Sequence, residues 1–232
     1  MTIFEVMKTT DLTNLNPAAT HEDIAQLLKT ACEYKAYSVC VPLYYTLFVR
    51  DALPIVAQGD YQPKICTVIG FPHGNTMPQV KMFEAAQAVQ YGADEVDMVI
   101  NIGAVKERNT EFLLSEINNV AEACKGRVLK VIIETSMLTE EEKIYAAQIV
   151  ERSAADFIKT STGYGGGGAT LHDVELLKKH VGTKKIKASG GISSLKFAED
   201  LINAGAQRLG SSSIIKTYEK LFESEVKSAE ST

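Results

Sequence analysis

The chain alternates between short apolar segments and longer segments with helical spacing, and this alternation limits its fold more than any other feature. The candidate strands are Lys8–Thr13, Tyr37–Val41, Ile65–Gly70, Glu95–Asn101, Val128–Thr135, Phe157–Ser161, Lys185–Ser189 and Arg208–Gly210. The candidate helices follow in the same order: Thr20–Tyr34, Leu43–Leu53, Pro78–Tyr91, Glu111–Lys125, Glu140–Arg152, Leu171–His180, Ser194–Ala204 and Ile214–Phe222. Repeated strand–helix pairs are typical of parallel βαβ units with right-handed crossovers.

Several candidate strands are almost continuously apolar, as in VCVP, CTVIG, VDMVI and VIIE. This pattern is typical of parallel strands that helices cover on both sides. Eight such units leave little of the 232 residues for anything else. We therefore predict one (β/α)8 barrel domain, a TIM barrel, over residues 1–232. An open doubly wound sheet is the alternative. The polar segment 226–232 is expected to be frayed.

Composition excludes several classes of protein. The net charge is −5, which gives no reason to expect nucleic acid or an anionic membrane as a partner. No apolar run reaches the roughly 18–20 residues of a membrane-spanning helix. The start MTIFEVMKTTDL has no signal-peptide pattern, and four cysteines without a CxxC pair suit reduced thiols. We therefore expect a cytoplasmic protein.

Four ionisable residues interrupt strands that should be apolar: Asp97, Lys130, Lys159 and Lys187. A single strand lysine can extend its ammonium group into water, so each one alone is weak evidence. Lys159 and Lys187, however, stand near the carboxyl ends of successive strands, where barrel enzymes place their reactive groups. A second lysine and partial desolvation both favour the neutral form of an amine, and a neutral lysine attacks carbonyl groups. A nearby carboxylate can then move protons.

Three glycine- and serine-rich turns follow the last three candidate strands: Ser161–Thr170, Ser189–Ser193 and Gly210–Ser213. Each turn precedes a helix N-terminus, which favours anions, and barrels commonly bind phosphate at their last loops. The glycines can also be simple tight turns. The four histidines have no metal-binding spacing, so we expect no metal. The cysteines are expected mainly as small core residues.

These segments resemble the 2-deoxyribose-5-phosphate aldolase family. The resemblance rests on DLTNL (Asp11–Leu15), VCVPL (Val39–Leu43), VIGFPHG (Val68–Gly74), GADEVDMVINIGA (Gly92–Ala104), LKVIIET (Leu129–Thr135), ADFIKTSTGYGGGGAT (Ala155–Thr170), KASGGI (Lys187–Ile192) and RLGSSS (Arg208–Ser213). It implies a barrel and a class I aldolase without cofactor or metal. The implied reaction is reversible cleavage of 2-deoxy-D-ribose 5-phosphate to glyceraldehyde 3-phosphate and acetaldehyde. Relatives are commonly dimers, so a homo-oligomer (dimer or tetramer) is expected.

The resemblance also assigns roles. Lys159 matches the lysine that forms the Schiff base, Lys187 the second lysine, and Asp97 the carboxylate of the proton relay. The expected substrate contacts are Lys130, Cys40, Asp11 and Thr160, and the expected phosphate contacts are Gly163, Gly190, Gly191, Ser212 and Ser213.

The sequence departs from the family pattern at one position that bears on proton transfer. Many members carry a C-terminal tyrosine at the site, whereas the last tyrosine here is Tyr218. Either water substitutes for it or enamine protonation is slower. The segment GYGGGG is also richer in glycine than in many relatives. The alternatives are a sugar-phosphate isomerase, a different lysine-imine barrel of the thiazole synthase or transaldolase type, and a sugar-phosphate-binding protein without activity.

Overall fold

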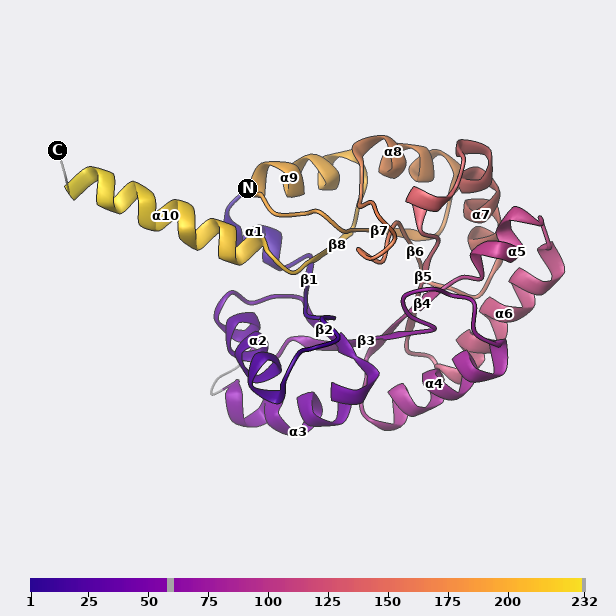
Figure 1. Ribbon diagram of the computed structural model, residues 1–232, viewed down its shortest axis with the longest axis horizontal. Coiled ribbons are helices and arrows are strands. Elements are labelled where there is room, and N and C mark those ends of the chain that lie inside the picture. The colour runs from indigo at the N-terminus through magenta and orange to yellow at the C-terminus, as the bar shows by residue number, and fades with distance from the viewer. Residues whose placement is uncertain (58–60, 231–232) are drawn as a thin grey trace.

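The computed structural model describes residues 1–57 and 61–230. Within them, eight parallel strands form a closed barrel in chain order, and β1 pairs with β8 to close it (Figure 1). The strands are β1 (Thr10–Thr13), β2 (Ser38–Pro42), β3 (Lys64–Ile69), β4 (Glu95–Val99), β5 (Val128–Ile132), β6 (Phe157–Lys159), β7 (Lys185–Ser189) and β8 (Arg208–Ser211). The predicted TIM barrel is therefore confirmed.

Helices surround this barrel, and the last one projects away from it (Figure 1). They are α1 (Ile3–Met7), α2 (His21–Glu33), α3 (Thr46–Val56), α4 (Pro78–Gln90), α5 (Ile102–Lys106), α6 (Thr110–Ala123), α7 (Glu140–Arg152), α8 (Leu171–His180), α9 (Leu195–Ala204) and α10 (Ile214–Glu230). Short 3-10 turns, η1 (Leu43–Tyr45) and η2 (Thr135–Met137), follow β2 and β5. None of the described helices has the length and apolar character needed to cross a bilayer.

Local capping explains where several helices begin. The Thr20 hydroxyl accepts a hydrogen bond from the Asp23 amide, and the Asp23 carboxylate accepts one from the Thr20 amide. Thr139 and Glu142 form the same reciprocal pair at the start of α7. Each pair satisfies amide groups that have no partner inside the helix. The sequence prediction of these two starts was accordingly right to within one residue.

The structure corrects several predicted boundaries. The strands predicted to reach Asn101, Thr135 and Ser161 end at Val99, Ile132 and Lys159. The first of these strands ends early because the Asn101 side chain accepts a hydrogen bond from the Ala104 amide and caps the start of α5. This helix was not predicted from the sequence. The helix predicted to end at Phe222 continues to Glu230. The expected fraying of residues 226–232 stays a prediction. Residues 231–232 lie outside the described part.

Candidate active site

The barrel interior brings three of the predicted residues into direct contact. Lys159 and Lys187 are register partners on β6 and β7. The Asp97 carboxylate on β4 reaches both: its Oδ2 lies 2.8 Å from Lys159 Nζ and 2.7 Å from Lys187 Nζ. All three side chains are buried. Successive residues of a strand face opposite sides of the sheet, and the strand register aligns Asp97, Lys159 and Lys187 on the side that faces the barrel interior.

A second group of charges lies beside this trio. Lys130, the register partner of Asp97, donates to Asp97 Oδ1 at 2.8 Å and contacts Glu95 Oε2 at 2.6 Å. Arg208 on β8 donates to Glu95 and to Asp11 Oδ1, at 2.7 and 2.8 Å. Asp11 also accepts from Lys187. The interior therefore holds a continuous network of buried ion pairs, whose members were not all identified from the sequence. Glu95 and Arg208 were missed.

The charges in this network do not balance when every group is ionised. Four cations (Lys130, Lys159, Lys187, Arg208) face three carboxylates (Asp11, Glu95, Asp97). The carboxylates Asp11 and Asp97 raise the pKa of Lys187, and Asp97 and Glu95 help to raise the pKa of Lys130, although burial opposes both shifts. Conversely, the surrounding lysines hold the pKa of Asp97 well below its usual value against the effect of burial. Loss of one proton from an amine would equalise the charges.

Lys159 is the amine of this network that reaches an open cavity. The cavity has a volume of about 850 Å³, and Lys159, Ser189 and the phosphate residues predicted from the sequence line it: Gly163, Gly190, Gly191, Ser212 and Ser213. Lys187, Asp97 and Lys130 do not line it. The Ser189 hydroxyl has no hydrogen-bond partner among the described residues. Substrate therefore has access to the Lys159 amine alone of the three lysines.

Two of the glycine-rich loops pack backbone to backbone beside the cavity. A Cβ atom on Gly168 would lie only 2.4 Å from the Gly190 carbonyl oxygen, so glycine is required there. The Ala169 amide donates to the carbonyl oxygens of Ser189 and Gly190, at 3.0 and 3.1 Å. Gly191 has a φ of +74° and no atom near the position of a side chain. Glycine at these positions leaves room for close approach to the backbone, as an anion site needs.

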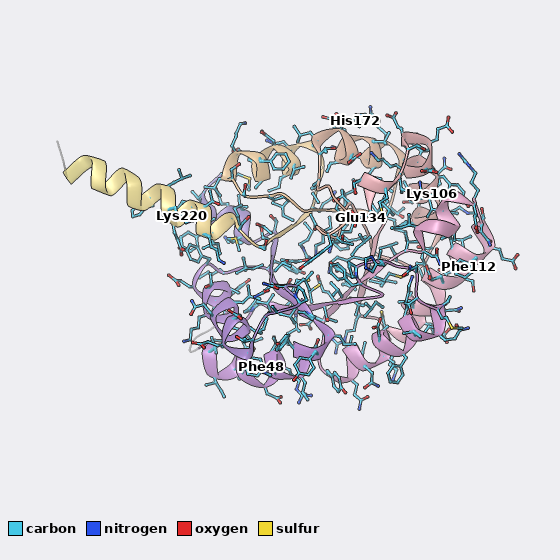
Figure 2. All side chains as sticks on the ribbon, viewed as in Figure 1. Phe48, Lys106, Phe112, Glu134, His172 and Lys220 are labelled. Carbon is cyan, nitrogen blue, oxygen red and sulfur yellow. The ribbon has the colours of Figure 1, made fainter. Side chains whose placement is uncertain are left out.

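Glu134, which lies between β5 and η2, holds the loop that follows β6. Its carboxylate is buried, accepts from the Thr162 amide and hydroxyl, and lies where a side chain on Gly165 would collide with it. Glu134 itself has a φ of +53°, which is uncommon for a residue with a side chain. Figure 2 shows Glu134 toward the middle of the ring, whereas His172 lies at its edge, where its side chain is exposed. Within the same loop, the Tyr164 hydroxyl donates to the Leu15 carbonyl oxygen across the mouth.

The other predicted substrate contacts are placed differently. Asp11 and Lys130 are fully enclosed by ion pairs, and Thr160 exchanges hydrogen bonds with the Ser189 backbone on β7. Cys40 is buried beside Cys66, its register partner on β3. None of these four lies on the cavity wall. Because these four side chains lie next to Lys187, Asp97 or Ser189, they help to hold those residues in position.

Two groups of described side chains have ligand atoms close enough to share a metal ion: Cys40, Cys66 and Asp97, and Asp11, Cys66 and Glu95. Their three carboxylates are already bound by lysine and arginine. A divalent cation would have to displace these partners and would be repelled by four neighbouring cations. The arrangement favours amine chemistry over metal chemistry.

Comparison with known proteins agrees with this geometry. The family model described as DeoC/LacD family aldolase matches residues 5–220. The chain belongs to this aldolase family. It is therefore a lyase, and the resemblance stated from the sequence is confirmed.

Individual relatives match over nearly their whole length. A deoxyribose-phosphate aldolase of Clostridioides difficile is 49% identical over 212 residues, which are 91% of this chain and 94% of the relative. One from Dictyoglomus turgidum is 46% identical over 214 residues, 92% and 95% of the two chains. The tetrameric deoxyribose phosphate aldolase structure from Aeropyrum pernix superimposes with a TM-score of 0.85 at 29% identity, covering 95% of this chain and 92% of the other.

Proposed function

We propose that this aldolase cleaves 2-deoxy-D-ribose 5-phosphate reversibly to D-glyceraldehyde 3-phosphate and acetaldehyde, with Lys159 as the nucleophile. One observation carries the proposal: beneath a cavity walled by glycine- and serine-rich loops, a single buried carboxylate, Asp97, holds both Lys187 and Lys159, and Lys159 borders that cavity. An isomerase or a binding protein that recognises a sugar phosphate has no need of paired amines at this position.

The reaction begins when neutral Lys159 Nζ attacks the C1 aldehyde of the sugar. The resulting carbinolamine loses water and gives a protonated imine, which is held covalently. Lys187 stays charged between Asp11 and Asp97 and so places a positive charge beside the Lys159–Asp97 pair.

The carbon–carbon bond then breaks. The C3 hydroxyl loses its proton, the C2–C3 electron pair moves toward the imine carbon, and glyceraldehyde 3-phosphate leaves. Asp97, through a water molecule and with Lys187, accepts this proton and later returns one to C2 of the enamine. Water hydrolyses the new imine and releases acetaldehyde. Asp97 suits this role because it already contacts both amines.

The phosphate is held away from the reacting carbons, at Gly163, Gly190, Gly191, Ser212 and Ser213. Support comes from the position of all five on the cavity wall and from the start of α10 directly after Ser213. Backbone amides and a helix N-terminus attract a phosphate without a charged side chain. Binding at this remote group positions C1 against Lys159 and so contributes to the rate of the reaction.

A product assay tests the function. Deoxyribose 5-phosphate is added, and proton NMR follows acetaldehyde while a coupled assay follows glyceraldehyde 3-phosphate. We expect equal amounts of both, and none from Lys159→Ala, whose folding is checked by circular dichroism. An isomer of the substrate, binding without turnover, or retained activity in Lys159→Ala would each contradict the proposal.

We also propose a homo-oligomer, a dimer or tetramer, that acts on small molecules in the cytoplasm. The name of the Aeropyrum pernix relative describes a tetramer, and α4 with its preceding residue exposes Met77, Val80 and Phe83. Four free cysteines suit a reducing compartment. Light scattering on the purified chain tests the assembly, and a monomeric mass would contradict it.

A further inference from the structure

Cys40 and Cys66 form a buried thiol pair next to the catalytic carboxylate. They are direct register partners on β2 and β3, and with Val68 they form a small cluster apart from the main core. Their sulfur atoms and a carboxylate oxygen of Asp97 all lie within 4.8 Å of one another. We propose that this pair is a redox-sensitive modification site: peroxide converts it to a disulfide, and the disulfide lowers aldolase activity reversibly.

The geometry permits a bridge without strand movement. Neighbouring strands lie about 4.8 Å apart, so the Cα atoms of register partners fall within the roughly 4.4–6.8 Å that disulfides span. Register partners on parallel strands also point to the same face, here the barrel interior. The other two cysteines differ: Cys32 is on α2 and half-buried, and Cys124 follows α6 in the outer shell, so neither has a partner on an adjacent strand.

The two thiols are not equivalent. The neighbouring Cys66 side chain and the nearby Lys187 and Lys159 lower the pKa of the Cys40 thiol against the effect of burial, whereas burial raises the pKa of Cys66 well above its usual value. Cys40 is therefore the more acidic thiol and the one that attacks, and Cys66 is the thiol that resolves. Thiolate character and access to the oxidant together select a cysteine for oxidation by peroxide. Both thiols are buried, so the bridge requires that peroxide, a molecule little larger than water, enters the barrel interior.

The chemistry balances with one hydrogen peroxide. The Cys40 thiolate attacks the O–O bond, becomes a sulfenic acid and releases hydroxide. Cys66 then attacks the Cys40 sulfur and displaces a second hydroxide. The two thiol protons convert both hydroxides to water. The pair of thiols loses two electrons, and the peroxide gains them.

The disulfide would act on Asp97. In the reduced state the Cys66 thiol donates to Asp97 Oδ1 at 3.3 Å, and Lys130 Nζ donates to the Cys66 sulfur at 3.5 Å. Bridging removes the thiol proton and pulls both sulfurs to about 2.05 Å from each other. Asp97 then loses a donor on one oxygen while its other oxygen still holds Lys159 and Lys187. We expect activity to fall by about tenfold, since a hydrogen bond to a charged group contributes at least about that factor.

Peroxide treatment followed by non-reducing peptide mapping tests the proposal. Trypsin releases Cys40 within residues 36–50 and Cys66 within 65–81, so the bridge appears as one linked pair that dithiothreitol separates. Its formation should parallel the loss of activity, and dithiothreitol should restore both. The mapping is independent of the substrate, so it stands even if the proposed sugar is wrong.

Variants sharpen this test. Cys32→Ser, the matched control, should bridge and lose activity like the parent chain. Cys66→Ala should instead carry oxygen on peptide 36–50 without a bridge, with circular dichroism as the folding check. The proposal is overturned if peroxide leaves 36–50 and 65–81 unlinked, if the bridge involves Cys32 or Cys124, or if the bridge forms while activity is unchanged.

Discussion

Replacing Asp97 by asparagine removes the carboxylate that joins three buried lysines. Its oxygens lie 2.8, 2.8 and 2.7 Å from the amines of Lys130, Lys159 and Lys187. Lys130 keeps Glu95 and Lys187 keeps Asp11. Within the described part of the chain, Lys159 has no second carboxylate in contact. The variant therefore leaves four cations facing two carboxylates in the interior.

The expected loss of stability follows from this imbalance. Removing one partner of a buried ion pair costs about 3–5 kcal/mol, and we expect the lower end because Lys159 borders the cavity. About 3 kcal/mol corresponds to a Tm lower by about 6–12 °C for a chain of this size. Loss of the proton relay should lower kcat by about 10²–10⁴.

Glu95→Gln is the matched control, because Glu95 is also a buried carboxylate on β4 that binds two cations but does not contact Lys159. Calorimetry should show a similar fall in Tm, whereas the coupled assay should show a decrease in kcat of less than about tenfold, since the relay is intact. The reasoning is refuted if Asp97→Asn keeps kcat within tenfold of the parent, or if Glu95→Gln lowers kcat as much as Asp97→Asn.

Three further predictions concern pH, packing and the anion site. Asp11 and Asp97 have lowered pKa values and Lys187 has a raised one, so the stability that these groups contribute should be complete between about pH 4 and 10.5. This stability should be lost as the pH falls below or rises above that window, and the Tm should therefore fall at both ends. Lys81→Met leaves Glu116 buried without its cation at 2.7 Å and should cost about 3–5 kcal/mol in urea unfolding; adding Glu116→Gln should recover part of this, and a purely additive double variant would contradict the pairing. Gly168→Ala should shift the Gly190 backbone and raise KM for the phosphorylated sugar by about tenfold without changing KM for deoxyribose itself. Gly182→Ala is the control and should leave both KM values unchanged, because a Cβ atom there would lie no closer than 3.5 Å to another atom. Equal effects on both sugars would exclude a phosphate role for the loop that holds Gly168.

The sequence was sufficient for the barrel and for the three residues that meet in its interior, because both depend on local patterns. Apolar strands alternate with helical segments, and Lys159, Lys187 and Asp97 are conspicuous within such strands. Their meeting at one point follows from strand order in a closed barrel, where β4, β6 and β7 share one interior. Segments with strong turn signals, such as Lys185–Ser189 and Leu171–His180, were located to the residue.

The supporting groups were not visible in the sequence. Glu95 and Arg208 begin their strands, where a charged residue is expected to face solvent, and only the register shows that they bind each other inside the barrel. Glu134 adopts a left-handed backbone conformation that no pattern indicates. Asp11 and Lys130 were predicted to touch substrate, but their ion pairs depend on side chains from distant strands. Long-range pairing decides these roles, and it requires the folded structure.

Trapping the imine tests the role of Lys159 most directly. The chain is mixed with acetaldehyde, reduced with borohydride and digested with trypsin. An ethyl group on Lys159 should block cleavage there and produce a modified peptide spanning residues 153–178, and Lys159→Ala should take up no label at any lysine. A label on Lys130 or Lys187, or an unmodified chain, would contradict the assignment of Lys159 as the reactive amine.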